Sequence, residues 1–316
     1  MRTGARCATL ALLATAAAVA LVGGCTPPAP ADGSASLAAT GDQIARDAEK
    51  RLADQGLGSQ ISVLPRFTTQ TFLLTAAVTF PADLRGKALV DAAGGVRRTL
   101  LADRLLTPDQ TLLVDSLELT DAAVTGSTAR WNGDAVRPEL DAEARLWARM
   151  TDAVTDGLAV EEVHVWHDDG MPLSVEALDP SDDSAVPGSD LYTDVLDLVD
   201  AAGLAPRATR ITTWSQFSVS TVGRPRLGAH TLAALEGLRA LPFVGAVEVH
   251  ADASAVTVDA TLATAPGTED PMPWGPDERS EVHDALEAAD LPTAGVTVDV
   301  IAEPGGSPTR VWPPKD

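Results

Sequence analysis

The octapeptide Asp197-Leu-Val-Asp-Ala-Ala-Gly-Leu204 closes a stretch with helical spacing, and it returns later as Asp284-Ala-Leu-Glu-Ala-Ala-Asp-Leu291. Each copy reaches a β-branched strand residue seven positions further on, Ile211 and Val298 respectively. Leu52-Ala-Asp-Gln-Gly-Leu57 is a weaker third copy. Such internal sequence similarity is typical of a duplicated supersecondary unit. The alternative is that a composition rich in Ala, Leu and Asp produces similar octapeptides without duplication.

Apolar residues around these copies switch between helical and strand spacing. Spacing at i, i+3 and i+4 predicts amphipathic helices, and alternating or β-branched runs predict half-buried strands. The expected helices cover residues 41–56, 84–106, 138–157, 189–203, 227–241 and 276–290. The expected strands cover 61–63, 71–80, 111–119, 123–131, 160–166, 173–178, 211–222, 246–250, 255–262 and 296–301. Gly94-Gly95, inside the second helix, predicts a kink or a close contact.

We read the order of these elements as β-α-β-β-α-β from about residue 61 to 166, with the runs 61–63 and 71–80 taken together, and again from about 208 to 301, with a helix ahead of each run. This is the split-βαβ order of ferredoxin-like domains. We therefore expect an α+β protein of two tandem ferredoxin-like (split βαβ) modules, with antiparallel-rich sheets and helices on one face. The modules are expected at 37–180 and 189–303, separated by the turn-rich stretch Asp179–Gly188, and a disordered tail is expected at 304–316.

The first 24 residues are built like an export signal. Arg2 and Arg6 precede an apolar run, Ala8–Val22, that is too short for a stable membrane span. The run closes in Val22-Gly23-Gly24-Cys25, and this segment resembles the lipobox of bacterial lipoproteins over these residues alone. The resemblance implies removal of residues 1–24, lipidation (including palmitate) at Cys25, and a mature chain anchored in the cell membrane on its extracytoplasmic side. An ordinary cleaved export signal with an incidental cysteine is the alternative.

Cys7 and Cys25 are the only two cysteines in the chain. Cleavage and lipidation would leave no free thiol, which excludes disulfides, cysteine nucleophiles, iron–sulfur clusters and thiolate zinc sites from the mature chain.

The formal net charge is −22, and loss of Arg2 and Arg6 brings it to −24. An acidic chain repels a phosphate backbone, so we expect no nucleic-acid partner. Residues 25–36 are rich in Pro, Gly and Ser and are expected to form a flexible tether.

The candidate metal ligands are His164, His167, Asp168 and Asp169, which lie within six residues of one another. Imidazole and carboxylate together suit zinc and other transition metals. Strand geometry opposes this reading, because His164 and Trp166 would share one face of a strand while His167 opens the next turn. A hairpin turn at Asp168-Asp169-Gly170 explains the same residues without a metal. We expect no cofactor.

The sequence contains no motif for a nucleophilic hydrolase, a metalloprotease or a nucleotide-binding enzyme. We therefore expect a lipid-anchored envelope protein that binds or scaffolds without catalysis, with another envelope protein or a cell-wall component as partner. Trp274, in the loop Pro271–Pro276, is a candidate to meet a partner or a sugar ring. Two alternatives remain open: a metal-binding or metal-dependent envelope lipoprotein that uses the His-Asp cluster, and a purely structural lipoprotein.

Overall fold

The computed structural model describes residues 32–66, 71–101, 110–133, 139–158, 160, 162–168, 171–178, 187–204, 209–214, 217–222, 228–252, 254–265, 267, 270–288, 295–302 and 307–313. The predicted signal peptide, the lipidation candidate Cys25, the candidate ligand Asp169 and most of the predicted module boundary lie outside these residues.

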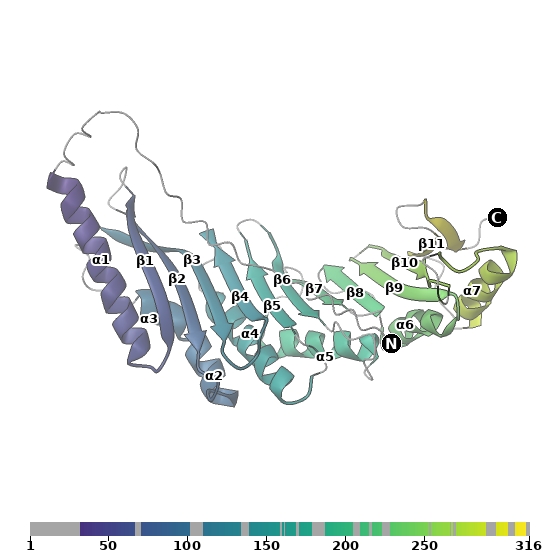
Figure 1. Ribbon diagram of the computed structural model, residues 1–316, viewed down its shortest axis with the longest axis horizontal. Helices are drawn as coiled ribbons and strands as arrows, with labels where there is room; N and C mark the ends of the chain where they lie inside the picture. The colour runs from purple at the N-terminus through teal and green to yellow at the C-terminus, as the bar shows by residue number, and fades with distance from the viewer. Residues whose placement is uncertain are drawn as a thin grey trace, which may run out of the picture.

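The named strands all belong to one 12-stranded sheet, and the helices alternate with strand pairs along the chain (Figure 1). The strands are β1 (Gly58–Arg66), β2 (Thr71–Phe80), β3 (Thr111–Asp121), β4 (Ser127–Asn132), β5 (Glu162–His167), β6 (Leu173–Leu178), β7 (Thr209–Trp214), β8 (Phe217–Val222), β9 (Val244–Ala251), β10 (Val256–Leu262), β11 (Val296–Ile301) and β12 (Thr309–Trp312). The helices are α1 (Asp32–Ala53), α2 (Gly86–Ala93), α3 (Val96–Leu101), α4 (Leu140–Thr155), α5 (Gly188–Ala201), α6 (Ala229–Gly237) and α7 (Pro276–Ala288), with a 3-10 turn, η3, at Leu238–Ala240.

The strands lie in the sheet in the order in which they occur in the chain. Strands joined by a short connection pair antiparallel, as β1 with β2 and β5 with β6. Strands joined through a helix pair parallel, as β4 with β5 across α4 and β8 with β9 across α6. The structural unit is therefore a strand pair followed by a helix, added again and again to one growing sheet.

The prediction of two ferredoxin-like modules is wrong, although the α+β class holds. In a split βαβ unit the crossover passes over an inserted strand, whereas here each crossover places the next strand directly beside the last. The sheet also continues through the expected boundary, because β6 pairs in parallel with β7 from Leu173↔Thr209 to Leu178↔Trp214. The internal similarity is that of an array of small units sharing one sheet.

The run 211–222, for which the sequence predicts a single strand, forms the antiparallel pair β7 and β8 instead. Ser215 and Gln216 separate the two strands, and neither is a glycine or proline that would mark a turn. Two other expectations are corrected. Residues 309–312 form β12 within the predicted disordered tail, and α1 begins at Asp32 within the predicted tether.

The helices α2, α4, α5, α6 and α7 follow one side of the sheet (Figure 1), each packed against the next in the series. Apolar side chains from the strands and helices meet there in one continuous core, with Trp131, Trp147 and Phe80 among the fully buried residues. The predicted helix 84–106 divides into α2 and α3 at Gly94-Gly95, where an added Cβ on Gly94 would lie 2.5 Å from Nε of Arg145. The glycine pair therefore permits a close contact between helices.

Helix α1 covers the free edge of β1. The backbone N–H of Ile61 donates to Oε1 of Glu49 at 3.1 Å, and the helix approaches so closely that a Cβ on Gly41 would lie 2.7 Å from the carbonyl oxygen of Val63. Pro65 has no N–H to offer at the same edge. An edge occupied in this way is protected against pairing with other chains.

Candidate functional site: the open face of the sheet

We call the sheet surface turned away from the helices the open face. Alternation along each strand separates it from the core: in β2, Phe72, Leu74 and Phe80 are buried, whereas Thr75 and Thr79 are exposed. The described helices α2, α4, α5, α6 and α7 lie on the other side of the sheet and leave this face uncovered (Figure 1). It is the candidate binding surface of the protein.

Side chains in register from β2 to β11 form a polar line across this face, which we call the hydroxyl row. Every position carries a hydroxyl, an imidazole or a carboxylate. The members, each paired with the next, are Thr79, Thr120, Thr128, His164, Glu176, Thr212, Ser220, His250, Thr257 and Thr297. Cross-strand contacts hold the row in place at 3.1 Å between the hydroxyls of Thr79 and Thr120 and at 3.2 Å between those of Thr212 and Ser220.

The row beside it, which we call the Trp166 row, combines an indole with charged groups. Its members, in register from β2 to β8, are Ala77, Glu118, Arg130, Trp166, Ser174, Arg210 and Val222. Trp166 is 45% exposed, and no aromatic ring is packed against it within the described ranges. An exposed indole at the centre of a sheet is costly to leave in water, so its position calls for an explanation in terms of binding.

The structure separates the predicted metal ligands. His164 lies on the open face, where Nδ1 is 2.8 Å from the hydroxyl of Thr128 and Nε2 is 3.3 Å from Glu162. His167 lies on the core side, where Nδ1 is 3.1 Å from Oε1 of Glu143 on α4. Asp168 accepts a hydrogen bond from Asn132 at 2.6 Å. The two imidazoles are on opposite sides of the sheet and do not converge on a common point, and Asp169 lies outside the described residues.

Glu143, missed at the sequence level, joins the helix layer to the sheet. Its carboxylate is almost fully buried and accepts a hydrogen bond from Nε1 of Trp131 at 2.6 Å, besides its contact with His167. Burial raises the pKa of Glu143, while the neighbouring His167 and the indole hydrogen bond oppose that rise. The only sequence signal for this network is an acidic residue at a position of α4 that faces the core.

The open face is hollowed over β1, β2 and β3, where a shallow cavity has a volume of about 280 Å³. Several of the lining side chains are small, among them Ala76 and Ala77 on the middle strand, and β3 carries an extra residue, Asp115, at a bulge nearby. The polar groups around it are an amide, hydroxyls and one carboxylate. The lining residues are Gln60, Ile61, Ser62, Thr75, Ala76, Ala77, Ser116 and Glu118.

Carboxylates gather on the open face at the far end of the sheet. Glu248, Asp259 and Asp299 lie side by side on β9, β10 and β11, and Arg310 on β12 closes the line by donating to both oxygens of Asp299 at 2.9 and 3.3 Å. Burial raises the pKa of Asp259, and the charge of Asp299 raises it further against the opposing effect of His250. This end of the face is acidic, in contrast to the arginines beside Trp166.

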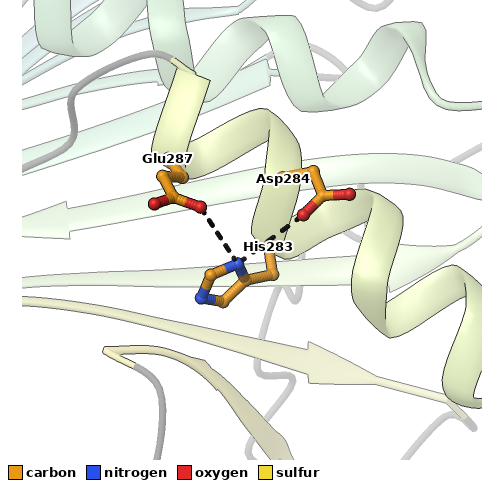
Figure 2. A group of neighbouring side chains, drawn as sticks. All are labelled: His283, Asp284 and Glu287. Carbon is orange, nitrogen blue, oxygen red and sulfur yellow. Dashed lines mark ion pairs between the residues drawn. The ribbon is translucent and has the colours of Figure 1, made fainter.

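A second acidic group lies on the outer surface of α7 (Figure 2). Nδ1 of His283 is 3.9 Å from a carboxylate oxygen of Asp284 and 3.9 Å from one of Glu287. The three potential ligand atoms lie within 4.8 Å of one another, a spacing that a shared metal ion can bridge. Both carboxylates are largely solvated, and the imidazole packs against the indole of Trp312 at 5.5 Å between ring centres. The group is explained as a solvated ion-pair set on a helix.

Trp274, the predicted contact residue, is engaged within the protein. Its ring lies 6.2 Å from that of Phe243 and under the guanidinium of Arg279 at 5.7 Å. Trp166 takes the exposed position instead. The alternation of side chains along a strand could have identified Trp166 as exposed, because it lies two positions from His164 and therefore on the same outward face.

Comparison with known protein families, characterised proteins and solved structures finds no match for this chain. Among the described helices, none combines the length and the apolar character needed to cross a bilayer.

Proposed function

We propose that this chain is a lipid-anchored, extracytoplasmic protein of the cell envelope that acts by binding, with the open face of its sheet as the binding surface. The observation that carries the proposal is the Trp166 row, an uncovered line of indole and guanidinium groups beside the hydroxyl row. Aromatic and arginine side chains on an exposed face are the groups most enriched at recognition surfaces. The partner is another envelope protein or a cell-wall component.

The lipobox-like segment supports the anchored location, because it ends in Cys25 directly after an export-type apolar run. A lipid at that position would leave the array tethered beside the membrane. The sheet is built to remain accessible there, since its helices occupy the opposite side and α1 protects one edge.

The anchor is tested by growing cells that express the full chain with an alkyne-bearing palmitate analogue. Wild type and Cys7→Ser are expected to carry the label and to sediment with membranes, whereas Cys25→Ser is expected to lose the label. Cys7→Ser is the matched control, because it removes the other cysteine of the chain. Label retained by Cys25→Ser, or an unlabelled wild type, would refute the anchor.

The binding face is tested by co-sedimentation of the purified full chain with isolated cell-wall and membrane fractions. Arg130→Ala and Arg210→Ala are expected to reduce the bound fraction, because Arg130 is next to Trp166 in the row and Arg210 follows beyond Ser174. Lys87→Ala is the control: its ammonium is 86% exposed on α2, on the helix side. Equal losses in all three variants would indicate a general charge effect and contradict a specific face.

A further inference from the structure

We infer that the Trp166 row binds an extended, uncharged glycan chain, with one pyranose ring stacked on the indole of Trp166. This inference rests on the proposed function and deepens it, because it selects a cell-wall-type polymer from the possible partners. Four observations carry it: the isolation of the exposed indole, the polar groups around it, the arginines on either side and the hollow further along the same row.

The exposed indole of Trp166 has polar residues at its adjoining positions on the open face. Its neighbours in register are Arg130 on β4 and Ser174 on β6, and the next position along its own strand is His164. A protein partner needs a contiguous apolar centre to its interface, and none of these three side chains extends the indole surface. A pyranose ring has a matching size and an apolar C–H face, so it covers the indole without leaving uncovered apolar surface.

Polar side chains lie on β4 and β5 on either side of Trp166 along the strand direction. Asn132 and Asp168 are joined at 2.6 Å, and Thr128 and His164 at 2.8 Å, so both pairs are oriented before any ligand arrives. Hydroxyl groups of a ring stacked on Trp166 can both donate to and accept from such pairs. Prearranged polar groups around an apolar centre are the usual composition of a small-ligand site.

Charges of both signs lie near the indole, which favours neither a strongly cationic nor a strongly anionic ligand. Arg130 lies one strand away on one side, and Arg210 lies two strands away on the other. A quaternary or primary ammonium would be repelled by both, although the indole alone would attract it. The carboxylates of Glu118 and Glu176, on the strands adjoining these positions, oppose a strongly anionic ligand. An uncharged, hydroxyl-rich chain satisfies both constraints.

The hollow over β1–β3 extends the site. Ala77 and Glu118 belong to both the hollow and the Trp166 row, so the two features lie on one line. From β2 to β5 this line crosses three strand spacings, ~14 Å. A flat chain of several pyranose rings can therefore stack on Trp166 at one end and place hydroxyls among Gln60, Ser62 and Thr75 at the other. A coiled chain does not follow a sheet surface in this way.

The test is calorimetric titration of the purified full chain, in a detergent without a sugar headgroup, with chitohexaose and cellohexaose, whose β-linked rings form flat extended chains. At least one of them is expected to bind. Trp166→Ala is expected to weaken that binding by about tenfold, and Trp166→Phe by less, because a ring remains. Met171→Ala is the matched control, since Met171 is 55% exposed and belongs to neither row. Its binding is expected to equal that of wild type.

Three outcomes would overturn the inference: neither hexasaccharide binds, Trp166→Ala binds as wild type does, or the coiled α-linked maltohexaose binds as tightly as the flat chains. These failures are distinct from failure of the proposed function. If the hexasaccharides fail while co-sedimentation still depends on Arg130 and Arg210, the open face binds a partner that is not a glycan. If they bind through Trp166 while Cys25 carries no lipid, the glycan site stands and the anchor does not.

Discussion

Nε1 of Trp131 on β4 donates to Oε2 of Glu143 on α4 at 2.6 Å, so strand and helix are joined inside the core by a hydrogen bond to a carboxylate. The same carboxylate lies 3.1 Å from Nδ1 of His167 on β5. One buried acid therefore connects two parallel neighbouring strands to the helix that joins them. Hydrogen bonds to charged groups contribute more than neutral ones, and their loss leaves buried donors without an acceptor.

Glu143→Ala is expected to destabilise the fold by about 3 kcal/mol, because it leaves the buried indole N–H of Trp131 without its acceptor and opens a small cavity. Glu143→Gln is the control that separates these effects, since its amide oxygen can still accept from the indole. Urea unfolding followed by circular dichroism measures both. Equal free energies of unfolding for wild type and Glu143→Ala would contradict a stabilising role for this network.

The same residue predicts a pH dependence. Burial raises the pKa of Glu143 above the ordinary value of a glutamate, so the folded state holds this proton more tightly than the unfolded state. Between the unfolded and folded pKa values the folded chain binds more protons, and its stability relative to Glu143→Gln therefore falls as pH rises through that window. Urea midpoints of both proteins from about pH 4 to about pH 7 test this. A difference that grows in favour of wild type with rising pH would contradict it.

Gly188 is expected to tolerate no side chain. A Cβ there would lie 2.6 Å from the carbonyl oxygen of Phe217, and the Gly188 N–H donates to Glu236 at 2.7 Å at the start of α5. Gly188→Ala should therefore destabilise the fold by roughly 1–3 kcal/mol through forced backbone movement.

Gly237→Ala provides the contrast for that variant. Gly237 closes α6 with a helical φ of −56°, and no atom lies within 4 Å of a Cβ built on it. Alanine should therefore be neutral or stabilise by up to about 1 kcal/mol. Thermal unfolding of both variants measures the difference. A destabilised Gly237→Ala beside an unaffected Gly188→Ala would contradict the close approach of α5 to β8.

The sequence predicts the elements better than their arrangement. Hydrophobic spacing identifies a helix over 276–290, where the structure has α7 (Pro276–Ala288), and the strand Thr71–Phe80, because a buried face imposes its own period on each element. Which strands lie side by side in the sheet leaves no comparable pattern in the local sequence. The β-branched run 211–222 contains no glycine or proline between β7 and β8, and that missed turn gives the second half of the chain a ferredoxin-like order. In the first half the runs 61–63 and 71–80 are both expected ahead of the helix, so the elements are found there and only their grouping is wrong.

The candidate site shows the same limit. Because alternate residues of a strand point to opposite faces, the sequence alone places His164 and Trp166 on one face and His167 on the other. The structure has the same arrangement. Which residues stand beside Trp166 depends on register across strands far apart in sequence. Arg130 and Arg210 are 80 positions apart in the chain, yet they lie one and two strands from Trp166 in the same row. No motif search can assemble such a row, because its members come from different strands.

The continuity of the sheet between β6 and β7 is open to a direct chemical test. Glu176 and Thr212 are paired in parallel register there, at the expected boundary of two modules. Their Cα atoms should be ~5 Å apart, within the range that a disulfide spans. Glu176→Cys with Thr212→Cys, in a background with Cys7 and Cys25 replaced by serine, is therefore expected to form a disulfide under mild oxidation.

The control pair, Glu176→Cys with Ser220→Cys, lies two strand spacings apart, ~10 Å, and should keep both thiols free. Thiol alkylation followed by mass spectrometry counts the free cysteines. Two free thiols in the first variant would show that β6 and β7 are not neighbours in solution and would return the chain to two separate sheets.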